Sequence, residues 1–199
     1  MKSLVNYAIG MLVVVMVLAA MPTEAESEIY EDTLRLHILA NSDTDADQEL
    51  KLAVRDKILT KYGDSLRLVH SIEEAKETVS SLIPEIEEDA EDWIRQLGYD
   101  YPVRATVSTE WYDTREYEDF TLPRGYYSSL RVIIGEGEGK NWWCVMYPPL
   151  CMEMATESAP ADDGIIDYTK EELSLIKSGS YQIKFKILEE LSSVFSKNG

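Results

Sequence analysis

The sequence predicts an α+β fold, a single domain in which a mostly antiparallel sheet packs against amphipathic helices. Two observations predict it. Apolar residues recur with helical spacing between residues 50 and 97, and then with the two-residue period of a strand from residue 103. The order of a strand, helices, several strands and a last helix is typical of one layered domain of this class.

The first 25 residues are expected to be an export signal and not part of the fold. Lys2 precedes an apolar run, residues 8–21 (AIGMLVVVMVLAAM), and the small residues before position 26 suit cleavage after Ala25. The run is shorter than the about 20 apolar residues that span a bilayer. We therefore predict a signal peptide at residues 1–25 and an exported domain at residues 26–199, with retention of the run as an anchor as the alternative.

The exported domain opens with a strand and a capped helix. Residues 34–40 (LRLHILA) alternate through His37 and then become fully apolar, which indicates a strand with a buried end. Residues 26–33 before it are polar and are expected to be a short lead-in. Asp45 and Gln48 have the spacing of a capping box, so a helix is expected to begin there and to end at Gly63.

A second helical pattern runs from residue 72 to residue 97, with Pro84 in its middle. Either two helices meet at Pro84 or one helix kinks there, and Gly98 is expected to cap the end. The acids between residues 85 and 92 lie opposite the apolar stripe and are expected to form a solvated face. Lys51 likewise lies off the apolar stripe of the first helix.

Strand-like segments fill the chain from residue 103 to residue 147. They are residues 103–109, 111–117, 130–134 and 142–147. Turn residues 121–125 (TLPRG) and a glycine-rich connection, residues 135–141 (GEGEGKN), separate them, so an antiparallel meander is the simplest assembly. An irregular acidic segment is expected at residues 152–179, with a short helix over 170–177 as an option, before a C-terminal amphipathic helix over 181–195.

The charge balance restricts the classes of partner. The chain has 19 basic and 37 acidic residues, a formal net charge of -18. Removal of residues 1–25 takes away Lys2 and Glu24, so the charge of the exported domain is unchanged. Such a chain lacks the basic footprint of a nucleic-acid-binding protein, and an anionic membrane surface repels it. The acid excess favours solubility and cationic partners.

The two cysteines support two different interpretations. Export would place Cys144 and Cys151 in an oxidising compartment, where an even number of cysteines favours a disulfide between them. The alternative is a secreted hydrolase with Cys144 as its nucleophile and His37 as its base. On alternation His37 points away from the core side of its strand, and an isolated strand histidine is usually a hydrogen-bonded structural residue.

No metal or cofactor is expected from the motifs. Oxygen ligands alternate along residues 41–49, but the glycine and glutamate of an EF-hand loop are missing, so a weak calcium-dependent module is only an alternative to a capped helix start. His37 and His70 are too few and too far apart for a histidine-based zinc site. The glycine-rich connection lacks the Walker A spacing and joins two strands, which argues against nucleotide binding.

Several stretches taken together resemble one family. They are residues 34–43 (LRLHILANSD), 51–56 (KLAVRD), 98–103 (GYDYPV), 122–127 (LPRGYY), 130–135 (LRVIIG) and 141–151 (NWWCVMYPPLC). Residues 30–152 thereby resemble the stage II sporulation protein R family of endospore-forming bacteria.

The resemblance implies a secreted signalling protein of sporulation and supplies no catalytic residues. Members are made in the forespore and exported into the space between the two septal membranes. There they trigger a membrane-embedded aspartic protease, the sporulation stage II GA protein, which then cleaves the precursor of sigma factor E. The resemblance directs attention to motif residues that either contact the receptor or hold the fold: His37, Asn41, Ser42, Asp43, Trp142 and Trp143.

Overall fold

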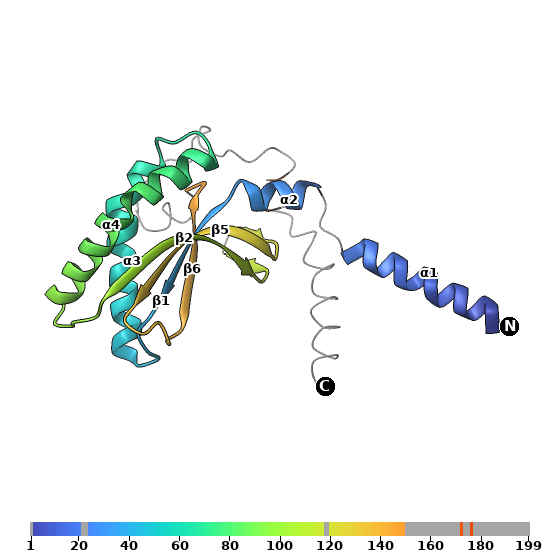
Figure 1. The fold of residues 1–199 in the computed structure, drawn as a ribbon, viewed down its shortest axis with the longest axis horizontal. Coiled ribbons are helices and arrows are strands. Elements are labelled where there is room, and N and C mark those ends of the chain that lie inside the picture. Colours follow the sequence, from blue (N-terminus) through green and yellow to red (C-terminus); the bar gives the residue numbers. More distant parts are fainter. Residues whose placement is uncertain (1, 21–23, 118–119, 150–171, 173–175, 177–199) are drawn as a thin grey trace. The chain divides into compact units, whose positions relative to one another are not determined.

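The computed structural model describes residues 2–20, 24–117 and 120–149, together with Glu172 and Ile176 (Figure 1). The chain divides into two compact units. Among the described residues, the larger unit contains 29–111 and 126–149, and the smaller unit contains the rest. The predicted irregular segment at 152–179 and the helices predicted at 170–177 and 181–195 lie outside the described residues, apart from Glu172 and Ile176. The bounds of the exported domain therefore stay a prediction.

The N-terminal residues form two helices. Helix α1 (Lys2–Ala20) contains residues 8–20 of the apolar run, and helix α2 (Glu24–Glu31) replaces the expected polar lead-in. The lead-in prediction was wrong because Ile29 is fully buried and the hydroxyl of Thr33 donates to the carbonyl of Ile29 at 2.5 Å, which fixes the chain before the first strand. Within the described part of the chain, none of the helices is long and apolar enough to cross a membrane.

The larger unit is built on a mixed four-stranded sheet, and the α+β class is confirmed. Its strands lie in the order β2 (Val103–Tyr112), β5 (Gly125–Ile134), β1 (Leu34–Leu39) and β6 (Asn141–Tyr147). Strand β1 pairs in parallel with β5 and antiparallel with β6. The predicted meander was therefore wrong in its strand order. All six residues of β1 are buried, so the sheet places this strand between two others and not at its edge.

Helix α3 (Asp45–Leu66) begins and ends slightly differently from the prediction. Its N-cap is Thr44, whose hydroxyl accepts from the backbone N–H of Asp47, so the cap lies one residue before the predicted one. The helix continues past Gly63 because Leu66 is 1% exposed and adds a buried apolar contact in the next turn.

Helix α4 (Ile72–Gln96) is one continuous helix that contains Pro84, which decides between the two options for this stretch. Ser71 caps its start by accepting from the backbone N–H of Glu74. Gly98 follows its end with φ +89°, a left-handed conformation that glycine adopts without steric cost, as predicted.

Helices α3 and α4 lie side by side along the sheet (Figure 1). The ammonium group of Lys61 on α3 pairs with Glu85 at 2.9 Å and with Asp89, both on α4. The Tyr62 hydroxyl also donates to Asp89. Asp89 thus accepts from two side chains of α3, and these bonds hold its pKa below the ordinary value although burial opposes this.

Two acids of α4 cover the outer edge of strand β2. The Glu91 carboxylate accepts from the backbone N–H of Val103 at 3.0 Å, and the Glu87 carboxylate accepts from that of Ala105 at 2.7 Å. The sequence predicted that the acidic side of α4 is a solvated face. The structure corrects this, because two of its acids bind the backbone of β2. Because β2 is an edge strand, these bonds satisfy donors that would otherwise be available to another chain.

The smaller unit contains a short hairpin. Strand β3 (Arg115–Glu116) pairs antiparallel with β4 (Thr121–Leu122), and the Tyr117 N–H donates to the Phe120 carbonyl at 2.8 Å. Thr121 and Leu122 were predicted in a turn. They form a strand because both are buried, Leu122 fully so.

Candidate functional site

One group of polar side chains lies across the four strands of the larger unit. We call it the His37 cluster, and its members are His37 (β1), Glu110 (β2), Arg131 (β5), and Asn141 and Trp143 (β6). In the register of the sheet, His37 lies directly opposite Arg131 on one side and Trp143 on the other. Residues that lie opposite one another in a sheet share a face, so strand pairing brings the cluster together.

His37 makes close contacts in three directions. Its Nδ1 lies 2.6 Å from Oε2 of Glu110, and its Nε2 lies 3.0 Å from Oδ1 of Asn141. Its ring stacks on that of Trp143, with 5.6 Å between centroids. Both ring nitrogens thus lie within hydrogen-bond distance of side-chain oxygens from neighbouring strands. The side chain of His37 is 11% exposed, so it serves mainly to join β1 to β2 and β6.

Glu110 is held from two further directions. Its Oε1 lies 3.5 Å from Nε of Arg131 and accepts from the Ser108 hydroxyl at 3.4 Å. The carboxylate is therefore flanked by one cation, one hydroxyl and the imidazole. This part-buried network joins four strands and so favours one strand register.

The proposed pairing of Cys144 with His37 is contradicted by the sheet. Cys144 lies opposite Leu36, whereas His37 lies opposite Trp143. Since successive side chains of a strand point to opposite faces, the thiol and the imidazole are on different sides of the sheet. Cys144 is 1% exposed and belongs to the core. Cys151 lies outside the described residues, so the disulfide between the two stays a prediction.

A second group connects the turn after β1 to the glycine-rich connection between β5 and β6. The Asn41 side chain accepts from the backbone N–H of Glu136 at 3.1 Å, and the Asp43 carboxylate accepts from that of Lys140 at 2.7 Å. The Gly139 N–H donates to the Ala40 carbonyl at 2.9 Å. We call this group the turn clamp. Its members are Asn41, Ser42, Asp43 and Asp47 after β1, and Glu136, Gly139 and Lys140 in the connection. It holds the β5–β6 connection where that connection passes the end of β1.

The glycines of the connection are explained by this close approach. A Cβ atom on Gly139 would lie 2.2 Å from the backbone oxygen of Ser42, and one on Gly135 would lie 2.3 Å from Oδ1 of Asn41. Gly135 and Gly137 also have positive φ values of 59° and 68°. The glycine-rich sequence is therefore required by packing.

Asp47 organises the polar side of the turn clamp. Its carboxylate accepts from the Ser42 hydroxyl at 2.5 Å and from the Asn41 amide at 2.9 Å. Burial by itself would raise the pKa of Asp47, but hydrogen bonds from Ser42, Asn41, Tyr101 and Thr44 outweigh it and hold the pKa below the ordinary value of 3.8. Asp47 is thus an ionised, structural carboxylate.

Lys51 is buried although the sequence placed it on the polar side of its helix. It is 4% exposed, and its ammonium group donates to the Gln48 side chain at 2.7 Å and to the Lys140 carbonyl at 2.8 Å. Burial lowers the pKa of Lys51, and the nearby charges of Lys140 and Arg55 act in the same direction against the attraction of Asp43. The glycine-rich connection covers this lysine, which helical periodicity alone does not reveal.

The acids of residues 41–49, for which a weak calcium site was only the alternative to a capped helix start, do not converge. Asp43 and Asp47 are hydrogen-bonded to different parts of the turn clamp. Among the described residues, no three His, Cys, Asp or Glu side chains gather in a way that could hold a metal ion.

The motif residues therefore separate into three places. His37 and Trp143 are in the His37 cluster, and Asn41, Ser42 and Asp43 are in the turn clamp. Trp142 lies on the other face of β6, where the guanidinium of Arg55 lies 4.9 Å from its ring centroid, and so it packs against α3. Sequence reasoning missed Glu110, because its partner His37 is 73 positions away and no local pattern connects them.

Comparison with known proteins identifies the family. The family model described as stage II sporulation protein R matches residues 30–157. The chain belongs to the stage II sporulation protein R family. A curated relative, the stage II sporulation protein R of Bacillus subtilis (strain 168), is 30% identical over 187 residues, which cover 84% of each chain. No solved structure matches.

Membership in the stage II sporulation protein R family confirms the resemblance found in the sequence and gives the chain a role in sporulation. The matched residues include both the His37 cluster and the turn clamp. The family is one of sporulation signalling proteins and is not known for catalysis.

Proposed function

We propose that this member of the stage II sporulation protein R family is an exported signal that activates a membrane-embedded aspartic protease, the stage II sporulation GA protein. The activated protease then cleaves the precursor of sigma factor E. The observation that carries the proposal is family membership, since the likeness to the Bacillus subtilis relative extends over 84% of both chains and is not confined to one motif.

The proposed mode of action is binding and not catalysis. The one enzyme site that the sequence suggested needs Cys144 and His37 together, and strand alternation puts them on opposite faces. The motif residues of the turn clamp are likewise engaged in backbone hydrogen bonds. The protein activates its partner by binding the active (for example dimeric) state of the protease more tightly than the inactive one, which shifts the population toward activity.

The proposed place of action is the space between the forespore and mother-cell membranes. The apolar run in α1 supports export, with cleavage after Ala25 or retention of the run as an anchor. N-terminal sequencing of the exported protein tests the cleavage, and mass spectrometry of unreduced peptides tests the Cys144–Cys151 disulfide that an oxidising compartment favours.

The test is reconstitution in a non-sporulating bacterial host. The full chain is co-expressed with the protease and the sigma factor precursor, and cleavage is measured by immunoblot. Cleavage is expected to rise clearly above the level without this chain. It is expected to stay at background in a control with a catalytically inactive protease. Equal cleavage with and without the chain would show the proposed function to be wrong.

Paired cysteine variants separate signalling from hydrolysis in the same assay. If the cysteines form a disulfide, Cys144→Ser and Cys151→Ser should reduce thermal stability and cleavage to the same extent. A hydrolase that uses Cys144 would instead lose activity only with Cys144→Ser.

A further inference from the structure

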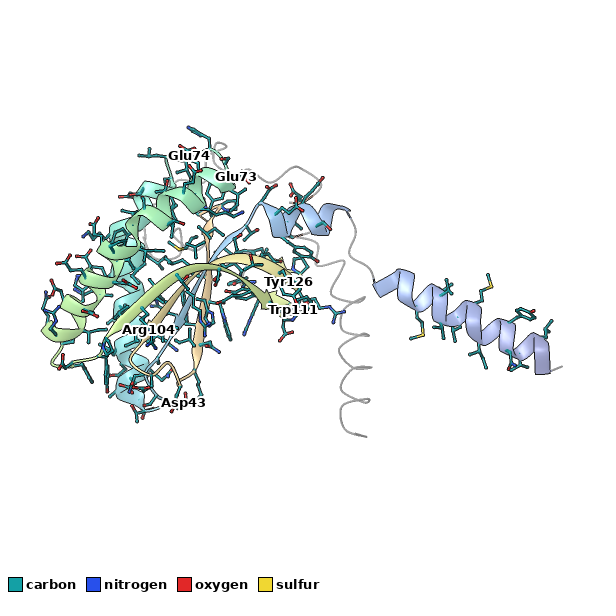
Figure 2. All side chains as sticks on the ribbon, in the orientation of Figure 1. Asp43, Glu73, Glu74, Arg104, Trp111 and Tyr126 are labelled. Atoms are coloured by element: carbon teal, nitrogen blue, oxygen red, sulfur yellow. The ribbon has the colours of Figure 1, made fainter. Side chains whose placement is uncertain are left out.

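Two aromatic rings of the larger unit are exposed next to each other. Trp111, near the end of β2, is 52% exposed, and Tyr126, near the start of β5, is 65% exposed. Their ring centroids are 5.0 Å apart at an interplanar angle of 70°, an edge-to-face pair. Figure 2 shows the two side chains together, at the end of the β2 ribbon opposite to Arg104. We call them the aromatic pair.

The exposure is unusual among the described aromatic residues of this unit. Tyr127, the next residue along β5, is fully buried, and Trp93, Trp142 and Trp143 are all at least partly buried. Leaving large apolar rings in water forgoes the gain of about 25 cal/mol for each Å² of apolar surface that burial would provide. Trp and Tyr are also the residues most enriched among those that dominate binding energies at protein interfaces.

The geometry of the aromatic pair suits it to binding. The two rings come from neighbouring strands of the sheet and pack on each other, so their positions are set before any partner arrives. Ordering a side chain on binding costs about 0.5–1.5 kcal/mol, and a preordered pair avoids part of that cost.

The charge of the chain selects among the classes of occupant. A net charge of -18 opposes association with a second copy of this chain and with an anionic lipid surface. It attracts a protein surface of the opposite sign, because complementary charge steers association and suppresses wrong partners. An apolar pocket with a basic rim on a protein matches both the rings and the charge.

We infer that Trp111 and Tyr126 are the anchor with which this protein docks into an apolar, basic-rimmed pocket on the exported portion of its membrane protease. The inference rests on the proposed function and adds the contact surface and the chemistry of the partner. Neither residue belongs to the His37 cluster or to the turn clamp.

The experiment uses the full chain co-expressed with the tagged protease and the sigma factor precursor. The variants are Trp111→Ala, Tyr126→Ala and the double substitution, and the control is Leu68→Ala, which removes a side chain that is 77% exposed elsewhere in the same unit. Each single substitution is expected to reduce co-purification with the protease about tenfold or more, and the double substitution is expected to abolish precursor cleavage. The control should behave as wild type.

A charge-reversed pair of substitutions tests the chemistry of the partner without depending on how well the alanine variants fold. Tyr126→Lys and Tyr126→Glu each place a charged side chain at an exposed position, so their effects on folding are expected to be similar. Tyr126→Lys is expected to weaken co-purification several-fold more than Tyr126→Glu, because a basic rim repels the lysine. The reverse order would overturn the assignment of a basic pocket. Thermal melting of each purified variant shows whether a loss of binding is a loss of fold.

The outcomes separate this inference from the proposed function. If the wild-type chain does not activate cleavage, the proposed function fails and the inference fails with it. If the wild-type chain activates and the double variant activates equally, only the inference is overturned. Binding to anionic vesicles that requires Trp111 would assign the aromatic pair to lipid, and a dimer lost in the double variant would assign it to a second copy. Either result overturns the protein pocket.

Discussion

At the scale of single residues, the motif positions contribute first to the fold. The polar residues after β1 resemble a ligand set in the sequence because they alternate along the chain. In the structure Asn41 and Asp43 accept from backbone N–H groups of the glycine-rich connection, about 95 positions away in sequence. A signature can therefore identify a family while its residues act by fixing the shape that a partner meets.

Asp47 gives a prediction on pH. Its folded pKa lies below its ordinary value, so its hydrogen bonds stabilise the native state at neutral pH, and this contribution is lost as pH falls through the folded pKa. Asp47→Asn is expected to lower the free energy of unfolding by about 1–3 kcal/mol at pH 7. The difference from wild type should begin to shrink below about pH 4, where the carboxylate of the unfolded chain becomes protonated, and should shrink further as pH falls through the lower folded pKa. Urea unfolding between these pH values measures it.

Asp45→Asn is the matched control, because Asp45 is exposed in the first turn of the same helix. It should change the free energy of unfolding by less than about 0.5 kcal/mol. At about pH 3 most ordinary carboxylates are protonated. If the free energy of unfolding still differs between wild type and Asp47→Asn by the same amount at that pH, Asp47 is not an ionised structural carboxylate.

At the scale of elements, helical periodicity predicted the helices α3 and α4 but not what their polar sides contact. The acids of α4 were expected to face water as a group. Two of them, Glu87 and Glu91, are one helical turn apart and reach successive outward N–H groups of β2, which are two residues apart. The spacing of the two carboxylates along the helix matches the spacing of the two N–H groups along the strand only because of where α4 lies beside the sheet.

Removal of these two carboxylates should open the edge of the sheet. Glu87→Ala and Glu91→Ala are each expected to cost about 1–3 kcal/mol, because each leaves a part-buried N–H without its acceptor. The double variant should also self-associate through β2, since an uncovered edge strand pairs with other chains. Chemical unfolding and sedimentation velocity measure the two effects.

Glu88→Ala on the exposed side of the same helix provides the comparison. It should leave both stability and association state unchanged, and Glu87→Gln, which keeps an acceptor oxygen, should retain most of the wild-type stability. A double variant as stable as the Glu88→Ala protein would rule out the proposed role in edge protection.

At the scale of the whole molecule, the acid excess acts on stability as well as on the choice of partner. The net charge of -18 makes the folded chain repel itself, and salt screens this repulsion. Raising NaCl from about 10 mM to about 150 mM shortens the screening length from about 30 Å to about 8 Å, and we expect the melting temperature to rise by about 2–4 °C. Calorimetry measures it, with an equal osmolarity of glycerol as the control. A fall in melting temperature with salt would mean that attractive charge pairs dominate.

The sequence by itself determined the α+β class, the family, the approximate bounds of α3 and α4, and the presence of strands in the regions of β1, β2, β5 and β6. These follow from local periodicity, from turn residues and from motifs, all of which can be read within a few residues of one another. Even there the ends differed, as at Thr44 and Gly63, because caps and buried last turns depend on what the helix packs against. The strand predicted over 111–117 was wrong, because β2 ends at Tyr112 and the separate strand β3 covers Arg115–Glu116, and β5 begins at Gly125 and not at residue 130.

Only the tertiary structure decided the strand order, the faces and the clusters. The insertion of β1 between β5 and β6 brings His37 to Trp143 and Glu110 and separates it from Cys144. It also makes the glycine-rich connection pass the end of β1 and bury Lys51. Strand pairing joins residues of β1 to residues that are about 94 to 113 positions away, and a change of register by one residue would move every side chain to the other face. No local pattern in the chain encodes that choice.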